Sequence, residues 1–192
     1  MAECQKDEDE ITPGYKAPAQ KSLQEIANQD ADDESLRRYK ESLLGNIGDI
    51  KKDPNDTRNI ILQSLSVVVE GRDDISLDLT GDLSKFKDSP ITMKEGTTYR
   101  LKMSFKITSE IVSGLQLLTT IHRKGIKVDT QRNMVGSYGP KADVQHYTGK
   151  PEDAPSGMIA RGKYTCKSKF IDDDKNVILE WQWILDIKKD WN

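Results

Sequence analysis

The sequence is poor in several residue types, and each shortage excludes a class of protein. It has 2 cysteines, Cys4 in a polar leader and Cys166 in a strand-like segment, so a disulfide framework is not expected. Nowhere does an apolar run approach the roughly 18 residues of a transmembrane helix. The acidic first ten residues lack the apolar stretch of a signal peptide. We therefore expect a cytoplasmic protein without stable membrane insertion.

Basic residues and histidines are also too few for two further classes. The formal net charge is −3, whereas nucleic-acid-binding proteins usually carry a clustered basic excess, so we expect no nucleic acid as a partner. The 2 histidines, His122 and His146, have no metal partners close in sequence. The acidic run 172–174 lacks the alternating ligand spacing of a calcium loop and is better explained as a turn. We expect no catalytic residues, no metal and no cofactor.

Composition changes near residue 58. Residues 1–58 contain 14 acidic and 9 basic side chains, and the rest contains 18 acidic and 20 basic ones. All 3 Trp and all 3 Phe lie after residue 58. The first segment therefore offers too little apolar surface to offset the entropy of ordering it alone. We predict a flexible N-terminal regulatory arm over 1–58 and one folded domain over 59–192.

The arm contains two helix signals. A capping box opens the segment 22–29 and predicts a short helix there. A second helix is predicted over 33–45, because Leu36, Tyr39 and Leu43 form one apolar stripe at helical spacing. Helices of this length are marginal in water, so they need a surface to fold against. That surface is either the second domain of the chain or a partner.

After residue 58 the apolar period changes to two, which is typical of strands. The segment Gly136–Pro140 is interpreted as a loop. Trp181 and Trp183 share one face of the last strand, which fits either an ordinary core or a hydrophobic ligand cavity. Seven to nine short strands without long helices favour an immunoglobulin-like antiparallel β-sandwich. The predicted strands cover 59–69, 75–80, 99–107, 115–122, 144–148, 163–171 and 177–187.

Several longer strings occur in one order from about residue 15 to the end of the chain. They are YKAPAQKS at 15–22, DDESL at 32–36, LLG at 43–45, LDLTGDL at 77–83, IVSG at 111–114, MVGSYGP at 134–140, DDDK at 172–175 and IKKDW at 187–191. Through these strings the sequence resembles the Rho GDP-dissociation inhibitors. The resemblance implies an immunoglobulin-like domain whose sheets open to admit a geranylgeranyl chain, and an arm that folds as a helical pair on the GTPase switch regions.

The resemblance also implies the partner and the site. The partner would be a GDP-bound, geranylgeranylated Rho-family small GTPase, held one to one by a monomeric inhibitor that blocks GDP release and extracts its client from membranes. The implied prenyl-binding residues are Leu77, Ile91, Tyr99, Met103, Ile111, Leu115, Leu117, Ile159, Cys166, Trp181 and Trp183. The implied GTPase-binding residues are Asp33, Leu36, Tyr39, Leu43, Leu44, Glu152, Asp153, Asp173 and Asp174.

Each implied GTPase contact has its own expected role. Asp33 is similar to an arm carboxylate that hydrogen-bonds the first switch. Asp173 and Asp174 resemble contacts to the second switch. Glu152 and Asp153 resemble an acidic pair that faces the basic tail before the prenylated cysteine. The apolar arm residues Leu36, Tyr39, Leu43 and Leu44 would act as anchors.

The sequence departs from the family pattern at a few positions, and two other functions stay open. His122 stands where the family often has an aromatic residue, and Cys166 and Ile91 replace bulkier side chains, so the pocket shape can differ. Lys163 and Pro90 occupy positions where some relatives carry kinase-target serines. The first alternative is a general prenyl or acyl carrier, although such a carrier needs no switch-binding arm. The second is a metal-dependent enzyme that uses residues 172–174 and a histidine.

Overall fold

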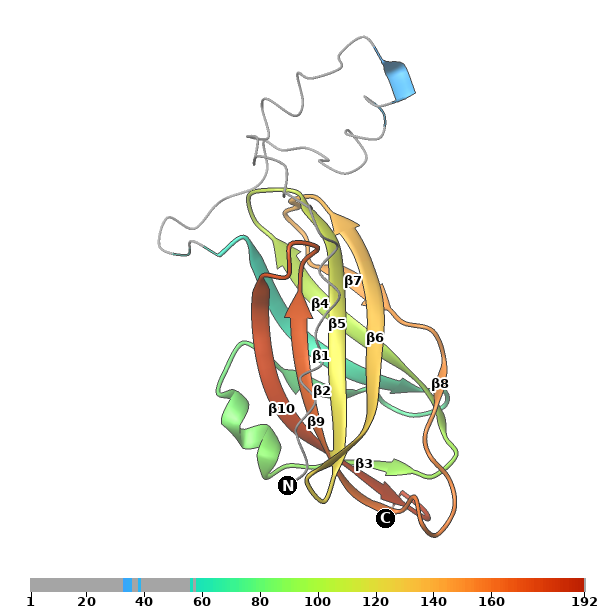
Figure 1. Ribbon diagram of the computed structural model, residues 1–192. Helices are drawn as coiled ribbons and strands as arrows, with labels where there is room; N and C mark the ends of the chain where they lie inside the picture. Colours follow the sequence, from blue (N-terminus) through green and yellow to red (C-terminus); the bar gives the residue numbers. More distant parts are fainter. Residues whose placement is uncertain (1–32, 36–37, 39–55, 57, 192) are drawn as a thin grey trace, which may run out of the picture.

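The computed structural model describes residues 33–35, 38, 56 and 58–191 (Figure 1). Between residues 60 and 188 it contains ten strands and a short 3-10 helix, η2. Their bounds are β1 (Ile60–Val69), β2 (Ile75–Asp78), η2 (Leu83–Lys87), β3 (Ile91–Lys94), β4 (Thr98–Ile107), β5 (Val112–Arg123), β6 (Ile126–Tyr138), β7 (Gln145–Thr148), β8 (Glu152–Asp153), β9 (Gly162–Ile171) and β10 (Val177–Lys188).

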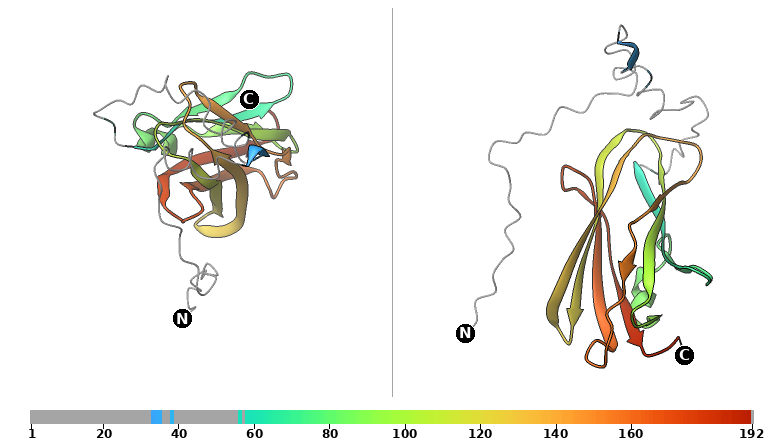
Figure 2. Two further views of the ribbon diagram at one scale, coloured as in Figure 1. Left: turned by 90° about the horizontal axis from the view of Figure 1, so that it is seen from above. Right: turned by 90° about the vertical axis from the view of Figure 1, so that its right-hand side faces the viewer.

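The strands form two five-stranded sheets that face each other (Figure 2). One sheet has the order β2-β1-β4-β7, and β8 also pairs with β4. The other sheet has the order β3-β10-β9-β5-β6. All the pairs are antiparallel except β3 with β10, which is parallel. The predicted β-sandwich is confirmed, with this one parallel edge as a departure from the antiparallel pattern.

The core lies between the sheets because alternate side chains on the long strands point inward. On β4 the buried positions run from Tyr99 to Ile107 in steps of two, and Phe105 in their midst is 0% exposed. Its ring meets that of Tyr138 edge-on at 4.8 Å and lies 6.1 Å from that of Phe170. Since Phe105 belongs to one sheet and its two neighbours to the other, this aromatic group joins the layers.

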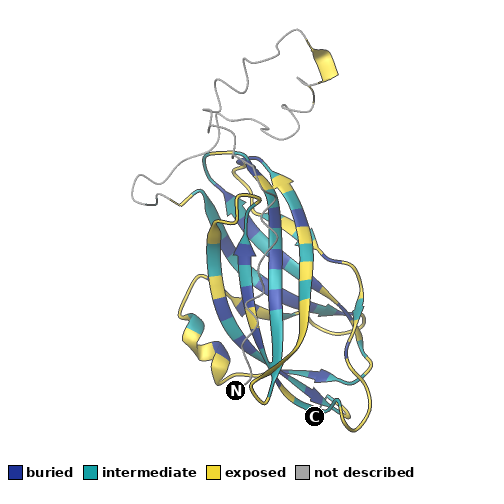
Figure 3. Ribbon diagram, viewed as in Figure 1, coloured by how far each residue is buried: buried dark blue, intermediate teal, exposed yellow. Residues whose placement is uncertain are grey.

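Strand prediction succeeded for the long strands with one apolar face, but it missed three other strands. All seven predicted strand segments are present, whereas β3, β6 and β8 were not predicted. The loop prediction for Gly136–Pro140 is wrong at its start, because Gly136–Tyr138 end β6. Over most of its length β6 is exposed, as Figure 3 shows, and its exposed residues include Ile126, Val128 and Met134 as well as charged side chains. It is a strand because it pairs along β5 as the second half of a hairpin, and its apolar residues do not keep a period of two along the whole strand.

The arm is described at only a few positions. Glu34, Ser35 and Arg38 are helical, in agreement with a helix that begins near Asp33. The Asp33 carboxylate accepts a hydrogen bond from the Ser35 N–H at 2.9 Å, which is the geometry of an N-cap. The rest of the helices predicted at 22–29 and 33–45 lies outside the described residues. The domain boundary at residue 58 stays a prediction.

Gly114 is the position where the fold depends most directly on glycine. Its φ is +58°, and a Cβ added there would lie 2.8 Å from the Cβ of Asp173. Gly71 has a similar φ of +76° but no atom within 4 Å of its added Cβ. We expect Gly114→Ala to lower the free energy of unfolding by about 1–3 kcal/mol more than Gly71→Ala, because only the former adds overpacking to backbone strain. Urea unfolding of both variants measures this difference, and equal losses would contradict it.

Candidate functional site

Six of the predicted prenyl-binding side chains meet between the sheets. They are at most 5% exposed and belong to one apolar cluster. They come from both layers, so the cluster exists only when the sheets are stacked. These six are Met103 on β4, Leu115 and Leu117 on β5, Cys166 on β9, and Trp181 and Trp183 on β10. We refer to them as the inter-sheet cluster.

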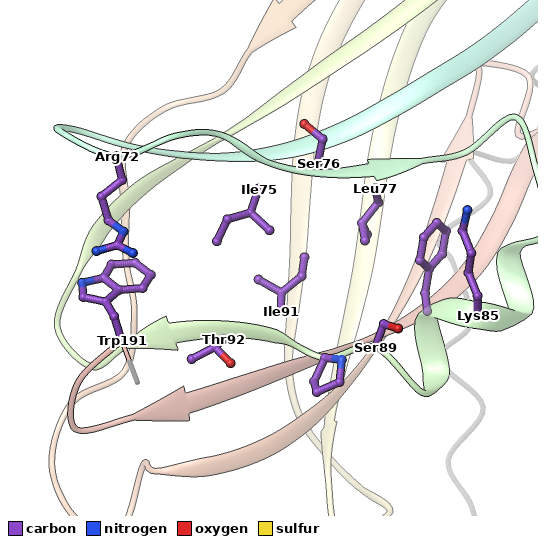
Figure 4. A pocket seen from close by; sticks show the side chains of 11 residues that line it. Arg72, Ile75, Ser76, Leu77, Lys85, Ser89, Ile91, Thr92 and Trp191 are labelled. Carbon is purple, nitrogen blue, oxygen red and sulfur yellow. The ribbon is translucent and has the colours of Figure 1, made fainter.

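Two more predicted residues line a pocket at the open edge of the sandwich (Figure 4). This edge pocket has a volume of about 450 Å³ and lies between β2, η2 and β3. Leu77 and Ile91 point into it. At one end the Arg72 guanidinium stacks over the Trp191 ring at 4.1 Å, and Lys85 lies at the other end. The edge pocket therefore joins an apolar floor to two cationic ends.

The remaining predicted apolar residues lie at the margins. Tyr99 is 9% exposed at the start of β4. Ile111 is partly buried just before β5. Ile159, in contrast, is 87% exposed in the turn before β9, so the structure does not bring it into the inter-sheet cluster. Its backbone carbonyl accepts a hydrogen bond from Arg123.

A polar group lies inside the apolar interior and was missed by sequence reasoning. The Ser168 hydroxyl is 2.9 Å from that of Thr119 and accepts a hydrogen bond from the Trp183 indole N–H at 3.0 Å. Because these partners satisfy one another, the hydroxyls can be buried without a large penalty. Ser168 alternates with Cys166 and Phe170 along β9, so its inward position could have been found from strand parity. The buried indole N–H of Trp181 has no acceptor in the described part of the chain.

The acidic pair on β8 is held beside the apolar interior. The Tyr99 hydroxyl donates a hydrogen bond to Glu152 at 3.0 Å, and the Thr98 hydroxyl donates to Asp153 at 2.6 Å. Burial, and then the negative charge of Glu152, raises the pKa of Tyr99 above its usual range. The hydroxyl therefore remains a neutral donor at physiological pH. The pairing of β8 with β4 thus places two carboxylates at the border of the predicted prenyl site, an adjacency that the sequence did not predict.

The acidic turn between β9 and β10 divides into a structural residue and two exposed ones. The Asp172 carboxylate accepts hydrogen bonds from the backbone and side-chain nitrogens of Asn176, at 2.8 and 2.9 Å. Asp173 and Asp174 are exposed, and the Asp173 N–H donates to the Ser113 carbonyl. Asp172 therefore shapes the turn, and its two neighbours are available to a partner. Among the residues that the structure describes, no three potential metal-ligating side chains gather at one point.

The two predicted GTPase-facing acidic regions lie toward opposite ends of the sandwich (Figure 1). The turn of Asp173 and Asp174 lies at the end where β1 begins, which is also where the arm connects. Glu152 and Asp153 lie on β8, toward the other end. Of the arm residues predicted to bind the GTPase, only Asp33 is described, and it is exposed. Leu36, Tyr39, Leu43 and Leu44 lie outside the described residues.

These features define the chain as a β-sandwich protein with an apolar interior bordered by carboxylates. Comparison with known proteins then gives the family. The profile of the family described as RHO protein GDP dissociation inhibitor matches residues 1–190. The chain belongs to this family.

Curated relatives agree with the family match. Rho GDP-dissociation inhibitor 1 from Homo sapiens is 49% identical over 189 residues, which cover 98% of this chain and 92% of the relative. A probable rho GDP-dissociation inhibitor from Caenorhabditis elegans is 43% identical, with 92% of each chain covered. The Rho GDP-dissociation inhibitor from Schizosaccharomyces pombe is 37% identical, with 98% of this chain and 93% of the relative covered.

Cys166 provides a chemical probe of the inter-sheet cluster. Burial raises the pKa of its thiol from 9.0 to about 12, so the thiolate is scarce at pH 8. In a Cys4→Ser variant we expect native protein to react with Ellman's reagent more than tenfold more slowly than protein unfolded in guanidinium. Rapid native reaction at pH 8 would show that the cluster is open to solvent.

The raised pKa of Cys166 also stabilises the fold below pH 9, and this contribution is lost as the pH rises from 9 to 12.

Proposed function

We propose that this protein is a Rho GDP-dissociation inhibitor that acts in the cytoplasm as a non-catalytic binding protein. It binds GDP-bound, geranylgeranylated Rho-family GTPases one to one, retains their GDP and withdraws them from membranes. The family match over residues 1–190 carries this proposal. The apolar interior beside the acidic pair of β8 supports it.

The isoprenoid would lie in the interior between the sheets. Transfer of each methylene from water to an apolar site contributes about 0.8 kcal/mol, so such a site can compete with a bilayer for the chain. The inter-sheet cluster is already buried, which means that the sheets must move apart to admit the ligand. Apolar contacts within the cluster are then exchanged for contacts with the isoprenoid. The paired hydroxyls of Thr119 and Ser168 can stay satisfied, since β5 and β9 are neighbours in one sheet.

The acidic pair would guide the client into this site. Glu152 and Asp153 border the interior through their hydrogen bonds to β4. Their negative charge complements the basic residues that precede a prenylated cysteine. Complementary charge of this kind accelerates association and sets orientation. It also competes with the anionic lipid that otherwise holds the basic tail.

The opposite end of the molecule would hold the switch regions. Asp33, with the apolar anchors that follow it in the arm, would contact the first switch, and Asp173 and Asp174 the second. Switch loops that cannot move keep the magnesium ion and GDP in place. Binding at both ends of the sandwich makes the second contact intramolecular, which raises the overall affinity. Both contacts are therefore needed for extraction.

A general prenyl or acyl carrier is the alternative within the same class of binding protein. It would use the same interior but would not depend on the arm. The two functions are separated by whether the protein slows GDP release as well as solubilising a lipidated client. Membership of the inhibitor family favours the first function.

The direct test uses vesicles that carry a geranylgeranylated Rho GTPase loaded with labelled GDP. We expect the full-length protein to release the GTPase into the supernatant and to slow GDP loss. Ile111→Glu should reduce release severalfold, because it places a charge against hydrocarbon at a partly buried site. Glu180→Gln, a change on an exposed strand position, is the control. Failure of the wild-type protein both to release the GTPase and to retain GDP would refute the proposed function.

Asp33 gives a second test, because its capping role and its GTPase contact can be separated. Asp33→Ala removes both the N-cap and the charge, whereas Asp33→Asn keeps a capping oxygen. If the carboxylate contacts the GTPase, both variants should weaken binding by about tenfold, as expected for a lost charge-assisted hydrogen bond. Calorimetric titration measures the affinities. Near-wild-type binding by Asp33→Asn would leave Asp33 with the capping role alone.

A further inference from the structure

Two loops at one end of the sandwich expose most of the large apolar side chains that the fold leaves uncovered. In the described part of the chain seven large hydrophobic residues are exposed, and four of them lie in these loops. The first loop is the tip of the β5–β6 hairpin, residues 123–128. The second is the turn that precedes β9, residues 155–163. The four are Ile126 at 70%, Val128 at 53%, Met158 at 83% and Ile159 at 87%.

The hairpin tip is a tight turn. Lys124 has φ +50° and Gly125 has φ +83°, which is the left-handed conformation of a two-residue hairpin loop. The strands resume at Ile126, so this side chain is fixed close to the end of the molecule. Polar residues usually occupy such tips. The isoleucine here is 70% exposed and is not among the apolar residues that form the core or pack against it.

The turn before β9 is fastened to the rest of the fold. The Gly157 N–H donates to Glu95 at 2.8 Å, and Arg161 forms an ion pair with the same carboxylate at 2.6 Å. Ala160 donates its N–H to the Gly157 carbonyl at 3.0 Å, which closes the turn. Met158 and Ile159 occupy its two central positions. Their exposure therefore belongs to a defined turn.

Arg123 joins the two loops into one surface. Its guanidinium donates hydrogen bonds to the carbonyls of Ile159 and Arg161, the latter at 2.7 Å, and lies 5.2 Å from the centre of the Tyr164 ring. Both loops lie at the same end in two perpendicular views (Figures 1 and 2). We call residues 123–128 and 155–163 together the two-loop surface.

The charge of the two-loop surface is of one sign, although the whole chain has a net charge of −3. Its two segments contain five basic residues and no acidic one. Nearby carboxylates are Glu95, which pairs with Arg161, Asp129, which follows the hairpin tip, and Asp186 on β10, which is the cross-strand partner of Lys163. Glu152 and Asp153 lie further along on β8. The five basic residues are Arg123, Lys124, Lys127, Arg161 and Lys163.

We propose that the two-loop surface docks the protein transiently on an anionic bilayer. Apolar side chains flanked by lysine and arginine suit the interface, where they enter the boundary between headgroups and acyl chains by about 5–10 Å. The basic side chains meet the negative surface potential. Met158 and Ile159 project from a turn, and Ile126 and Val128 from the first residues of β6 after the hairpin turn. This arrangement suits shallow insertion into lipid better than the flat, well-packed contact that a protein partner requires.

This docking would place the predicted entry to the apolar interior next to the membrane. Tyr99 and the acidic pair of β8 lie toward the same end as the two-loop surface. An isoprenoid that leaves the bilayer there would travel a short distance. Only this last link rests on the proposed function, since bilayer docking needs no GTPase.

The test uses the full-length protein alone, sedimented with vesicles of phosphatidylcholine or of phosphatidylcholine with 30% phosphatidylserine. We expect at least fivefold tighter binding to the anionic vesicles, weakening as salt rises. Ile126→Ser with Met158→Ser should weaken binding at least fivefold; neither residue belongs to the predicted prenyl site. The matched control is Met134→Ser with Val177→Ser, which changes two residues that are 56% and 54% exposed elsewhere. Binding that is absent, insensitive to lipid charge, or equal in both double variants would overturn the proposal.

Two further measurements separate bilayer docking from other occupants and from the proposed function. If the Ile126 and Met158 variant loses affinity for a prenylated GTPase in solution while it still binds vesicles, the surface is a protein interface and the proposal falls. If light scattering shows a wild-type dimer that the same variant abolishes, the occupant is a second copy, and the proposal also falls. Extraction without vesicle binding by the free protein would refute docking alone, whereas vesicle binding without extraction would support docking and count against the inhibitor function.

Discussion

The whole structure depends on the burial of alternate side chains between two sheets that share no strand. The inward residues of β4 face those of β5, β9 and β10, and Phe105 touches aromatic rings of the opposite layer. The two sheets are joined mainly by such contacts, which are apolar and lack direction. Such a junction can separate and close again with little change in backbone hydrogen bonding, because the hydrogen bonds run within each sheet. An interior that admits an isoprenoid, as proposed above, would need this property.

The buried polar groups hold strands together within each layer. Thr119, Ser168 and Trp183 are hydrogen-bonded within one sheet, so they give that layer a fixed inner face. Tyr99 and Glu152 connect β4 to β8 in the other layer. Each sheet can therefore move as a unit. At the far end, the acidic turn packs on Gly114 and leaves Asp173 and Asp174 exposed next to the start of β1.

Much of the sandwich could be predicted from the sequence, because strands with one apolar face record their orientation in every second residue. The inward positions of Met103, Cys166 and Trp183 follow from this rule. Contacts between strands distant in sequence could not be predicted. Edge strand β6 has no buried apolar face along most of its length, the two-residue strand β8 is too short to show a period, and the hydrogen bond from Tyr99 to Glu152 spans 53 residues. Ile159 was placed in the site by resemblance, but the conformation of its turn leaves it exposed.

Strand β6 has a consequence for the solubility of a protein whose core would loosen in the proposed function. It is the longest strand in the described part of the chain, and one of its sides ends a sheet without a neighbour. A free edge of this length could recruit a strand from another molecule and begin aggregation. Its stretch from Lys127 to Arg132 contains two basic residues and an aspartate beside Val128, Thr130 and Gln131, so a second β6 laid against it would bury charge. The charged residues that interrupt the apolar period of β6 thus also disfavour its pairing with β6 of another molecule.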